Sequence, residues 1–131
     1  MQIATWNVNS LRVRLPQLRD WLGGTRPDVI ALQETKTIDA DFPVGEIAAL
    51  GYQCVYSGQK TYNGVALLAT APLGDLCTEL PDFSDPQRRV LAATIGGLRV
   101  VNVYVPNGQS PESEKFTYKL GWLAALKRFL A

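Results

Sequence analysis

Two polar side chains end two apolar stretches of the chain, and both have the chemistry to bind a metal ion. Residues 3–6 are apolar or β-branched and are followed by Asn7, while residues 29–32 lead through Gln33 to Glu34. A helix-length segment separates the stretches, which predicts two parallel neighbouring strands joined by a crossover. The amide and the carboxylate would then lie side by side at the carboxyl edge of a sheet, where open α/β folds bind ligands.

A divalent cation is the ligand that this pair predicts. Mg²⁺ takes oxygen ligands, keeps several waters and needs only one or two protein carboxylates. Glu34 would bind the ion directly, Asn7 would position a water or a phosphate oxygen, and Lys36 would supply positive charge for a phosphate. Taken alone, Glu34 is as readily a solvated carboxylate and Lys36 a surface cation.

The composition excludes several other kinds of site. The chain has 131 residues, a net charge of +1 and no histidine. The lack of histidine excludes Ser-His-Asp and Cys-His catalysis and the usual zinc ligand sets for this chain acting alone. The charge neither requires nor excludes a nucleic-acid partner. We expect the two cysteines, Cys54 and Cys77, to be buried free thiols.

Two loops carry further candidate phosphate contacts. Asn9 and Arg12 follow the first strand, and the planar fork of an arginine suits phosphate. The alternative is a helix cap at Asn9 or Ser10 and a solvent-facing Arg12. Residues 59–64 combine a cation, an aromatic ring and amides at a hairpin tip, a combination that can contact nucleic-acid phosphates. An ordinary polar hairpin is the equally favoured alternative.

Tyr104 and Asn107 lie at the end of an apolar strand. Spacing alone favours a core ring for Tyr104 and a turn residue for Asn107, because Asn-Gly is a turn dipeptide. Arg88 and Arg89 enter the preceding strand and either brace a site or cap a sheet edge.

The predicted elements form an α/β fold. Residues 2–7, 29–34, 52–58, 65–70, 89–95 and 98–105 are predicted strands, and residues 11–22, 42–50 and 113–131 are predicted helices. Two parallel strands followed by hairpins and a helix predict a mixed sheet with helices packed on it. The last helix is apolar over most of its circumference, so it is expected to need cover on more than one side.

Six motifs, taken together and in order, resemble one family. They are residues 6–12, 32–36, 58–60, 63–68, 87–89 and 102–108. The chain is similar to exonuclease III and the related apurinic/apyrimidinic endonucleases, within the endonuclease/exonuclease/phosphatase superfamily. The resemblance implies half of a deoxyribonuclease-I-like four-layer sandwich. It also implies cleavage of phosphodiesters in double-stranded DNA, at abasic sites and 3′ ends, with Mg²⁺ or, in its place, Mn²⁺.

The resemblance also implies roles for individual residues. Glu34 would be the metal ligand with Asn7 as its neighbour, and Tyr104 and Asn107 would contact the scissile phosphate. The implied catalytic residues are therefore Asn7, Glu34, Tyr104 and Asn107, and the implied DNA contacts are Asn9, Arg12, Lys36, Lys60, Tyr62 and Asn63.

The chain departs from the family pattern in one major way. The Asp, Asn and late Asp-His pair that the family carries in its second half have no counterpart here. Residues 1–131 are therefore expected to be the N-terminal portion of one domain whose C-terminal half is absent, inactive alone, and prone to self-association through the face left bare. With no leader or membrane-spanning run visible, we expect no membrane partner and a cytoplasmic setting.

Two alternatives remain open on the sequence. One is a scaffold that binds metal or DNA without catalysis. The other is a different phosphoesterase of the superfamily, such as a phosphatase acting on inositol phosphates or a sphingomyelinase-like enzyme.

Overall fold

The computed structural model describes residues 1–131, which form two compact units. The first unit comprises residues 1–78 and 87–104, and the second comprises residues 79–86 and 105–131. The first unit holds both β-sheets and the two shorter helices, and the second is built around the C-terminal helix.

A four-stranded sheet lies at the centre of the first unit. Its strands are β1 (Ile3–Asn7), β2 (Val29–Gln33), β3 (Gln53–Ser57) and β4 (Val65–Ala69), in the order β1-β2-β4-β3. The strands β1 and β2 are parallel, with Asn7 paired to Gln33, whereas β4 runs antiparallel to both of its neighbours. The predicted parallel pair is therefore confirmed.

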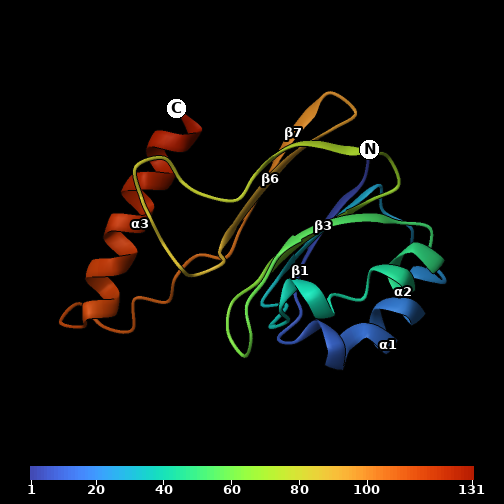
Figure 1. The fold of residues 1–131 in the computed structure, drawn as a ribbon, viewed down its shortest axis with the longest axis horizontal. Helices are drawn as coiled ribbons and strands as arrows, with labels where there is room; N and C mark the ends of the chain where they lie inside the picture. Colours follow the sequence, from blue (N-terminus) through green and yellow to red (C-terminus); the bar gives the residue numbers. More distant parts are fainter. The chain divides into compact units, whose positions relative to one another are not determined.

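Helices cover one face of this sheet (Figure 1). Helix α1 (Leu11–Leu22) buries leucines at helical spacing and ends at Gly23, as the sequence predicts. The predicted helix over 42–50 is shorter than expected: a 3₁₀ turn, η1 (Asp39–Asp41), precedes helix α2 (Val44–Ala49). Pro43 lacks a backbone N–H and stands at the N-cap of α2, so the helix begins after it.

A second sheet covers the other face. It is antiparallel and contains β5 (Leu73–Cys77), β6 (Val90–Ile95) and β7 (Leu98–Val103). The predicted mixed sheet is the four-stranded one, and the 90–103 hairpin forms this second sheet by pairing with β5. Strand β5 was not predicted; it exposes its central residues and contains a register shift, so it lacks regular alternation.

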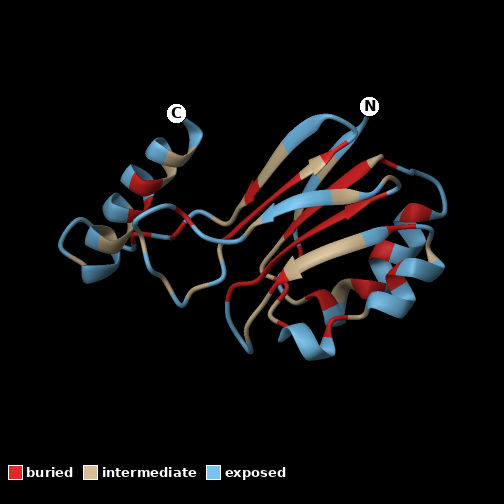
Figure 2. Ribbon diagram, turned by 45° about the horizontal axis from the view of Figure 1, so that its top comes forward, coloured by how far each residue is buried: buried red, intermediate tan, exposed pale blue.

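Strands β2 and β4 are buried on both faces, which explains their continuous apolar runs. Ile30, Leu32 and Leu68 pack with the leucines of α1, whereas Ala31 and Leu67 pack with strand β6. Figure 2 shows this buried centre. A rigid double-sided sheet thus supports the loops that follow β1 and β2.

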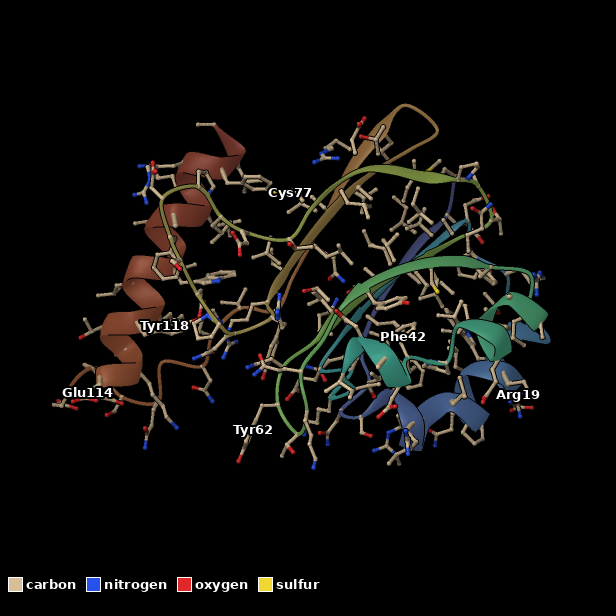
Figure 3. The ribbon with its side chains drawn as sticks, viewed as in Figure 1. Arg19, Phe42, Tyr62, Cys77, Glu114 and Tyr118 are labelled. Atoms are coloured by element: carbon tan, nitrogen blue, oxygen red, sulfur yellow. The ribbon has the colours of Figure 1, made fainter.

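The second unit contains helix α3 (Glu114–Leu130). Ser113 caps it by accepting a hydrogen bond from the backbone N–H of Lys115 at 3.0 Å, as predicted. Tyr118, labelled on α3 in Figure 3, donates its hydroxyl to Asp85. Leu120 and Leu130 are more than half exposed, so much of the helix's apolar surface is uncovered. No helix of the chain is long and apolar enough to cross a membrane.

Candidate active site at the carboxyl edge of the sheet

Backbone hydrogen bonds join the loops that follow β1 and β2. The N–H of Val8 donates to the carbonyl of Gln33 at 3.0 Å, and the N–H of Ser10 donates to the carbonyl of Glu34 at 2.8 Å. The ladder between the parallel strands therefore continues past their ends. The edge that carries Asn7 is fixed against the edge that carries Glu34, as the sequence predicts.

Glu34 leaves its strand in a left-handed conformation. Its φ is 56°, and Lys36 repeats this conformation at 55°. Strand alternation would aim Glu34 toward α1 with Ile30 and Leu32, but the positive φ ends the strand and redirects the side chain. Non-glycine residues in this region are uncommon, cost about 1–3 kcal/mol each and gather at functional sites.

The hairpin between β3 and β4 holds the Glu34 loop in place. The N–H of Thr35 donates to the carbonyl of Gly64 at 3.2 Å, and that of Lys36 donates to the carbonyl of Asn63 at 2.9 Å. A Cβ on Gly64 would lie 2.1 Å from the Thr35 hydroxyl oxygen, and the φ of Gly64 is 95°. Only glycine therefore allows the two loops to approach this closely.

Tyr104 connects the second sheet to Glu34. Burial raises the pKa of the Tyr104 hydroxyl above its usual value, and the charge of Glu34 and its hydrogen bond with the phenol raise that pKa further. The half-buried ring also packs against the apolar residues between the sheets. Tyr104 is therefore a core ring, as spacing alone favours, and its hydroxyl interacts with Glu34; its role at a site stays a prediction.

Arg89 braces Tyr104 from the neighbouring strand. Its guanidinium carbon lies 4.7 Å from the centroid of the Tyr104 ring, and its Nη1 donates to the Tyr104 carbonyl at 3.1 Å. Its Nε donates to Gln87 Oε1 at 2.8 Å. Arg89 opposes the rise in the pKa of Tyr104. Arg89 therefore braces Tyr104.

Asn9 links the predicted metal edge to the predicted phosphate contacts. Its backbone N–H donates to Asn7 Oδ1 at 3.1 Å, and its own Oδ1 accepts from Lys36 Nζ at 2.6 Å. Asn9 has a φ of 45°. The structure thus brings Asn7, Asn9 and Lys36 together in one network.

A cationic hollow of about 310 Å³ lies beside this network. Its cations are Arg12, Lys36 and Lys60, and its one carboxylate is Asp41. Three of the predicted DNA contacts therefore surround one space that could accept the phosphates of a nucleic-acid backbone.

Tyr62 and Asn63 are neighbours with opposite environments. Tyr62 is 68% exposed at the hairpin tip and points away from the sheet (Figure 3). Asn63 is buried and donates Nδ2 to Gln59 Oε1 at 3.1 Å. Tyr62 is free to stack on or bond a ligand, whereas the side chain of Asn63 stabilises the hairpin.

Asn107 belongs to the second unit. Its Oδ1 accepts a hydrogen bond from the backbone N–H of Gln109 at 3.0 Å, which is the turn geometry that its sequence context favours. Its contact with a scissile phosphate stays a prediction.

Sequence reasoning missed Asn102 and assigned no role to the side chain of Gln33. Asn102 lies on β7, is 3% exposed, and accepts a hydrogen bond from Gln33 Nε2 at 2.8 Å. The available signal was a lone amide within the apolar run of residues 100–103.

The donor set fits a magnesium ion held from one side. No group of three or more His, Cys, Asp or Glu side chains could enclose a metal ion. Glu34 and Asn7 offer oxygen ligands at a sheet edge, and Mg²⁺ needs no more than one or two protein carboxylates. An ion held by Glu34 and Asn7 would therefore take most of its ligands from water or substrate.

The chain is similar to known proteins of one family. Residues 4–130 match the model of the Endonuclease/Exonuclease/phosphatase family. The chain belongs to this family. Exodeoxyribonuclease III of Haemophilus influenzae is 38% identical over 99% of this chain and 51% of that protein. The DNA repair nuclease APEX1 of Danio rerio is 29% identical, with 99% and 44% covered.

Solved structures of family members superimpose closely. The 3′–5′ exonuclease NExo of Neisseria meningitidis is 50% identical with a TM-score of 0.97, covering 99% of this chain and 51% of that one. An AP endonuclease of Archaeoglobus fulgidus is 40% identical with a TM-score of 0.95 and the same coverage. A variant of NExo, described as a 3′ phosphatase, was solved with a product DNA hairpin.

These matches confirm the expected fold class: two sheets with helices, corresponding to half of a deoxyribonuclease-I-like nuclease. The chain spans about half the length of the curated relatives it matches.

Proposed function

We propose that residues 1–131 supply one half of the active site of a Mg²⁺-dependent DNA repair nuclease, which cleaves phosphodiesters at abasic sites and 3′ ends. The observation that carries the proposal is the convergence of Glu34, Asn7 and Tyr104 at one edge of the sheet, beside a hollow with three cations. The similarity to exonuclease III and AP endonucleases supports DNA as the substrate.

Each residue has a role that its environment supports. Glu34 would hold Mg²⁺, with Asn7 orienting a water or a phosphate oxygen. When bound, the ion would stabilise the negative charge that develops on the phosphate. Tyr104 has one hydroxyl proton, which it shares with Glu34 in the free protein; braced by Arg89, it would donate that proton to an oxygen of the scissile phosphate when DNA binds.

The cationic hollow would bind the DNA backbone. Arg12, Lys36 and Lys60 face one space of about 310 Å³, while Tyr62 projects from the hairpin tip. These groups contact phosphate or stack on bases without reading sequence. They suit a nuclease that recognises a damaged or terminal position.

Hydrolysis needs more than these residues offer. A base must generate hydroxide, and a second acid or amide must orient it. The chain contains no histidine, and its metal edge carries one carboxylate. We therefore propose that residues 1–131 alone are inactive, and that activity requires the half of the fold that the matched relatives possess in addition.

A chimera would test the function. Residues 1–131 are joined to the half of Neisseria NExo that they do not match, giving a chain that we call the completed enzyme. Abasic duplex, recessed 3′ ends, 3′-phosphate ends and a small phosphomonoester are offered side by side with Mg²⁺. We expect cleavage of the DNA substrates only. Faster hydrolysis of the phosphomonoester than of any DNA substrate would favour another phosphoesterase of the superfamily.

The non-catalytic alternative predicts a different result. A scaffold that only binds metal or DNA would leave all four substrates intact in the completed enzyme, with NExo itself as the positive control. Metal titration into residues 1–131 and into Glu34→Ala would then show whether the carboxylate binds Mg²⁺ loosely, as a single carboxylate should.

Self-association of residues 1–131 is a further part of the proposal. Leu120 and Leu130 of α3 are exposed, and uncovered apolar patches drive association. Light scattering should report a mass above that of the 14.4 kDa monomer. A monomer that binds no apolar dye would contradict this part.

A further inference from the structure

The side chain of Asn102 makes three hydrogen bonds across the two sheets of the first unit. Its Nδ2 donates to the carbonyl of Leu32 on β2 at 2.9 Å and to the carbonyl of Ala66 on β4 at 2.8 Å. Its Oδ1 accepts from Gln33 Nε2 at 2.8 Å. One side chain of the second sheet is therefore bonded to both central strands of the first.

This amide stands in an otherwise apolar interface. The residues around it between the sheets are aliphatic: Val29, Ala31, Val65, Leu67, Leu91 and Ala93. Burying an amide costs free energy that only its hydrogen bonds offset. Aliphatic packing alone tolerates small slips between sheets, whereas three directional bonds fix one register. The polar residue therefore restricts where the sheets can lie along each other.

The register that Asn102 fixes also determines how Tyr104 lies relative to Glu34. Asn102 lies two residues before Tyr104, and the backbone N–H of Tyr104 still donates to the carbonyl of Arg89 at 2.8 Å. The extended pairing therefore continues, and both side chains face the first sheet. On β2, Leu32 lies two residues before Glu34. The bond between Asn102 and Leu32 is thus followed, two residues along each chain, by Tyr104 and Glu34, which lie close enough to interact.

Gln33 extends the link to the remaining strand of this edge. Its Nε2 also donates to Thr5 Oγ1 at 2.9 Å, and Thr5 lies on β1 two residues before Asn7. The network therefore reaches the strands that carry Asn7, Glu34 and Tyr104.

We infer that Asn102 is a positioning residue, whose buried amide sets the distance between the Glu34 carboxylate and the Tyr104 hydroxyl and so aligns the two sheets for phosphodiester hydrolysis. It touches neither metal nor DNA. The catalytic part of this inference rests on the proposed function; the alignment part does not.

The first test measures alignment in residues 1–131 without activity. The free energy of unfolding is measured for the wild type, Glu34→Gln, Tyr104→Phe and the double variant, and the cycle gives the coupling between the two side chains. The same cycle is repeated in an Asn102→Leu background. We expect the coupling to be present in the wild type and lost with Asn102→Leu. A coupling that survives unchanged would overturn the inference.

A milder variant keeps the test decisive if Asn102→Leu does not fold. Gln33→Leu removes one of the three bonds from a partly exposed side chain and leaves the two carbonyl contacts of Asn102 in place. We expect it to reduce the coupling. Full coupling in Gln33→Leu would contradict the proposed network.

The second test measures catalysis in the completed enzyme. Asn102→Leu should lower kcat by about 10²-fold while KM stays near the wild-type value, because small misplacements affect the transition state most. Tyr52→Phe is the control: its buried hydroxyl donates to the Pro27 carbonyl at 2.7 Å, and Tyr52 belongs to the apolar cluster on the α1 side of the sheet.

A kcat for Asn102→Leu no lower than that of Tyr52→Phe would overturn the positioning role. A wild-type completed enzyme without activity would instead contradict the proposed function, and the coupling would still decide the alignment.

Discussion

Arg89 lies over the ring of Tyr104, with its guanidinium carbon 4.7 Å from the ring centroid, and donates a hydrogen bond to the carbonyl of the same residue. The contact fixes both the side chain and the backbone of Tyr104. Tyr104 in turn interacts with Glu34, so Arg89, which directly precedes β6, holds the residue that contacts a carboxylate of the other sheet.

Arg89→Met should loosen this arrangement. It removes a partly buried cation–π contact, worth about 0.5–2 kcal/mol, and a hydrogen bond to the Tyr104 carbonyl. We expect the free energy of unfolding of residues 1–131 to fall by about 1–2 kcal/mol. Urea denaturation measures this. Arg99→Met, which alters an exposed arginine at the opposite end of β7, is the control, and equal losses for both would argue against a specific brace.

Gly64→Ala should be strongly destabilising. The new Cβ would lie 2.1 Å from Thr35 Oγ1, and the φ of 95° disfavours any L side chain. A loss of about 2–4 kcal/mol is expected from strain and the displaced loop. Gly74→Ala is the matched control, because a Cβ added at Gly74 would have no neighbouring atom within 4 Å. Similar melting temperatures for the two variants would show that the loops do not need this close approach.

Stability should decline in alkaline solution. Burial raises the pKa of Tyr52 above the usual 10.0, as it does for Tyr104. The folded chain then holds these phenol protons more tightly than the unfolded chain. The contribution of these two phenols to the free energy of unfolding is complete below pH 10.0. It is lost as the pH rises through their raised pKa values.

Denaturation on both sides of pH 10.0 checks this expectation. Tyr52→Phe should show a shallower decline in the free energy of unfolding than the wild type. The idea fails if the wild type and Tyr52→Phe lose stability in parallel.

Binding of DNA to the completed enzyme should depend on salt through the cationic hollow. Each phosphate neutralised by a cation adds about 0.9 to the slope of log affinity against log salt. Lys36→Ala or Lys60→Ala should each reduce that slope by about one such unit, as measured by fluorescence anisotropy. Arg99→Ala should leave it unchanged. Unaltered slopes for both lysine variants would place the DNA elsewhere.

The pairing of the two strands that end at Asn7 and Glu34 could be predicted from the sequence because strand ends are local signals. The runs ending at Asn7 and Glu34, separated by one helix, required only the rule that crossover strands are parallel. The turn at Asn63-Gly64 and the helix cap at Ser113 could be predicted for the same reason, because each depends on a few neighbouring residues.

The contacts across the two sheets could not be predicted in this way. The bond from Asn102 to Leu32 joins residues 70 positions apart, and neither residue type indicates its partner. The pairing of β5 with β6 depends on an irregular, exposed strand without alternation. Chain-distant pairing of this kind is decided by tertiary packing.

The central claim is that Glu34 holds the metal ion in half of a nuclease site. The most direct measurement is Mg²⁺-dependent incision of an abasic duplex by residues 1–131, by the completed enzyme and by its Glu34→Gln variant. We predict no incision by residues 1–131, incision by the completed enzyme, and a loss of at least about 10²-fold in Glu34→Gln. Incision by residues 1–131 at the rate of the completed enzyme, or a Glu34→Gln variant as active as the wild type, would contradict the account.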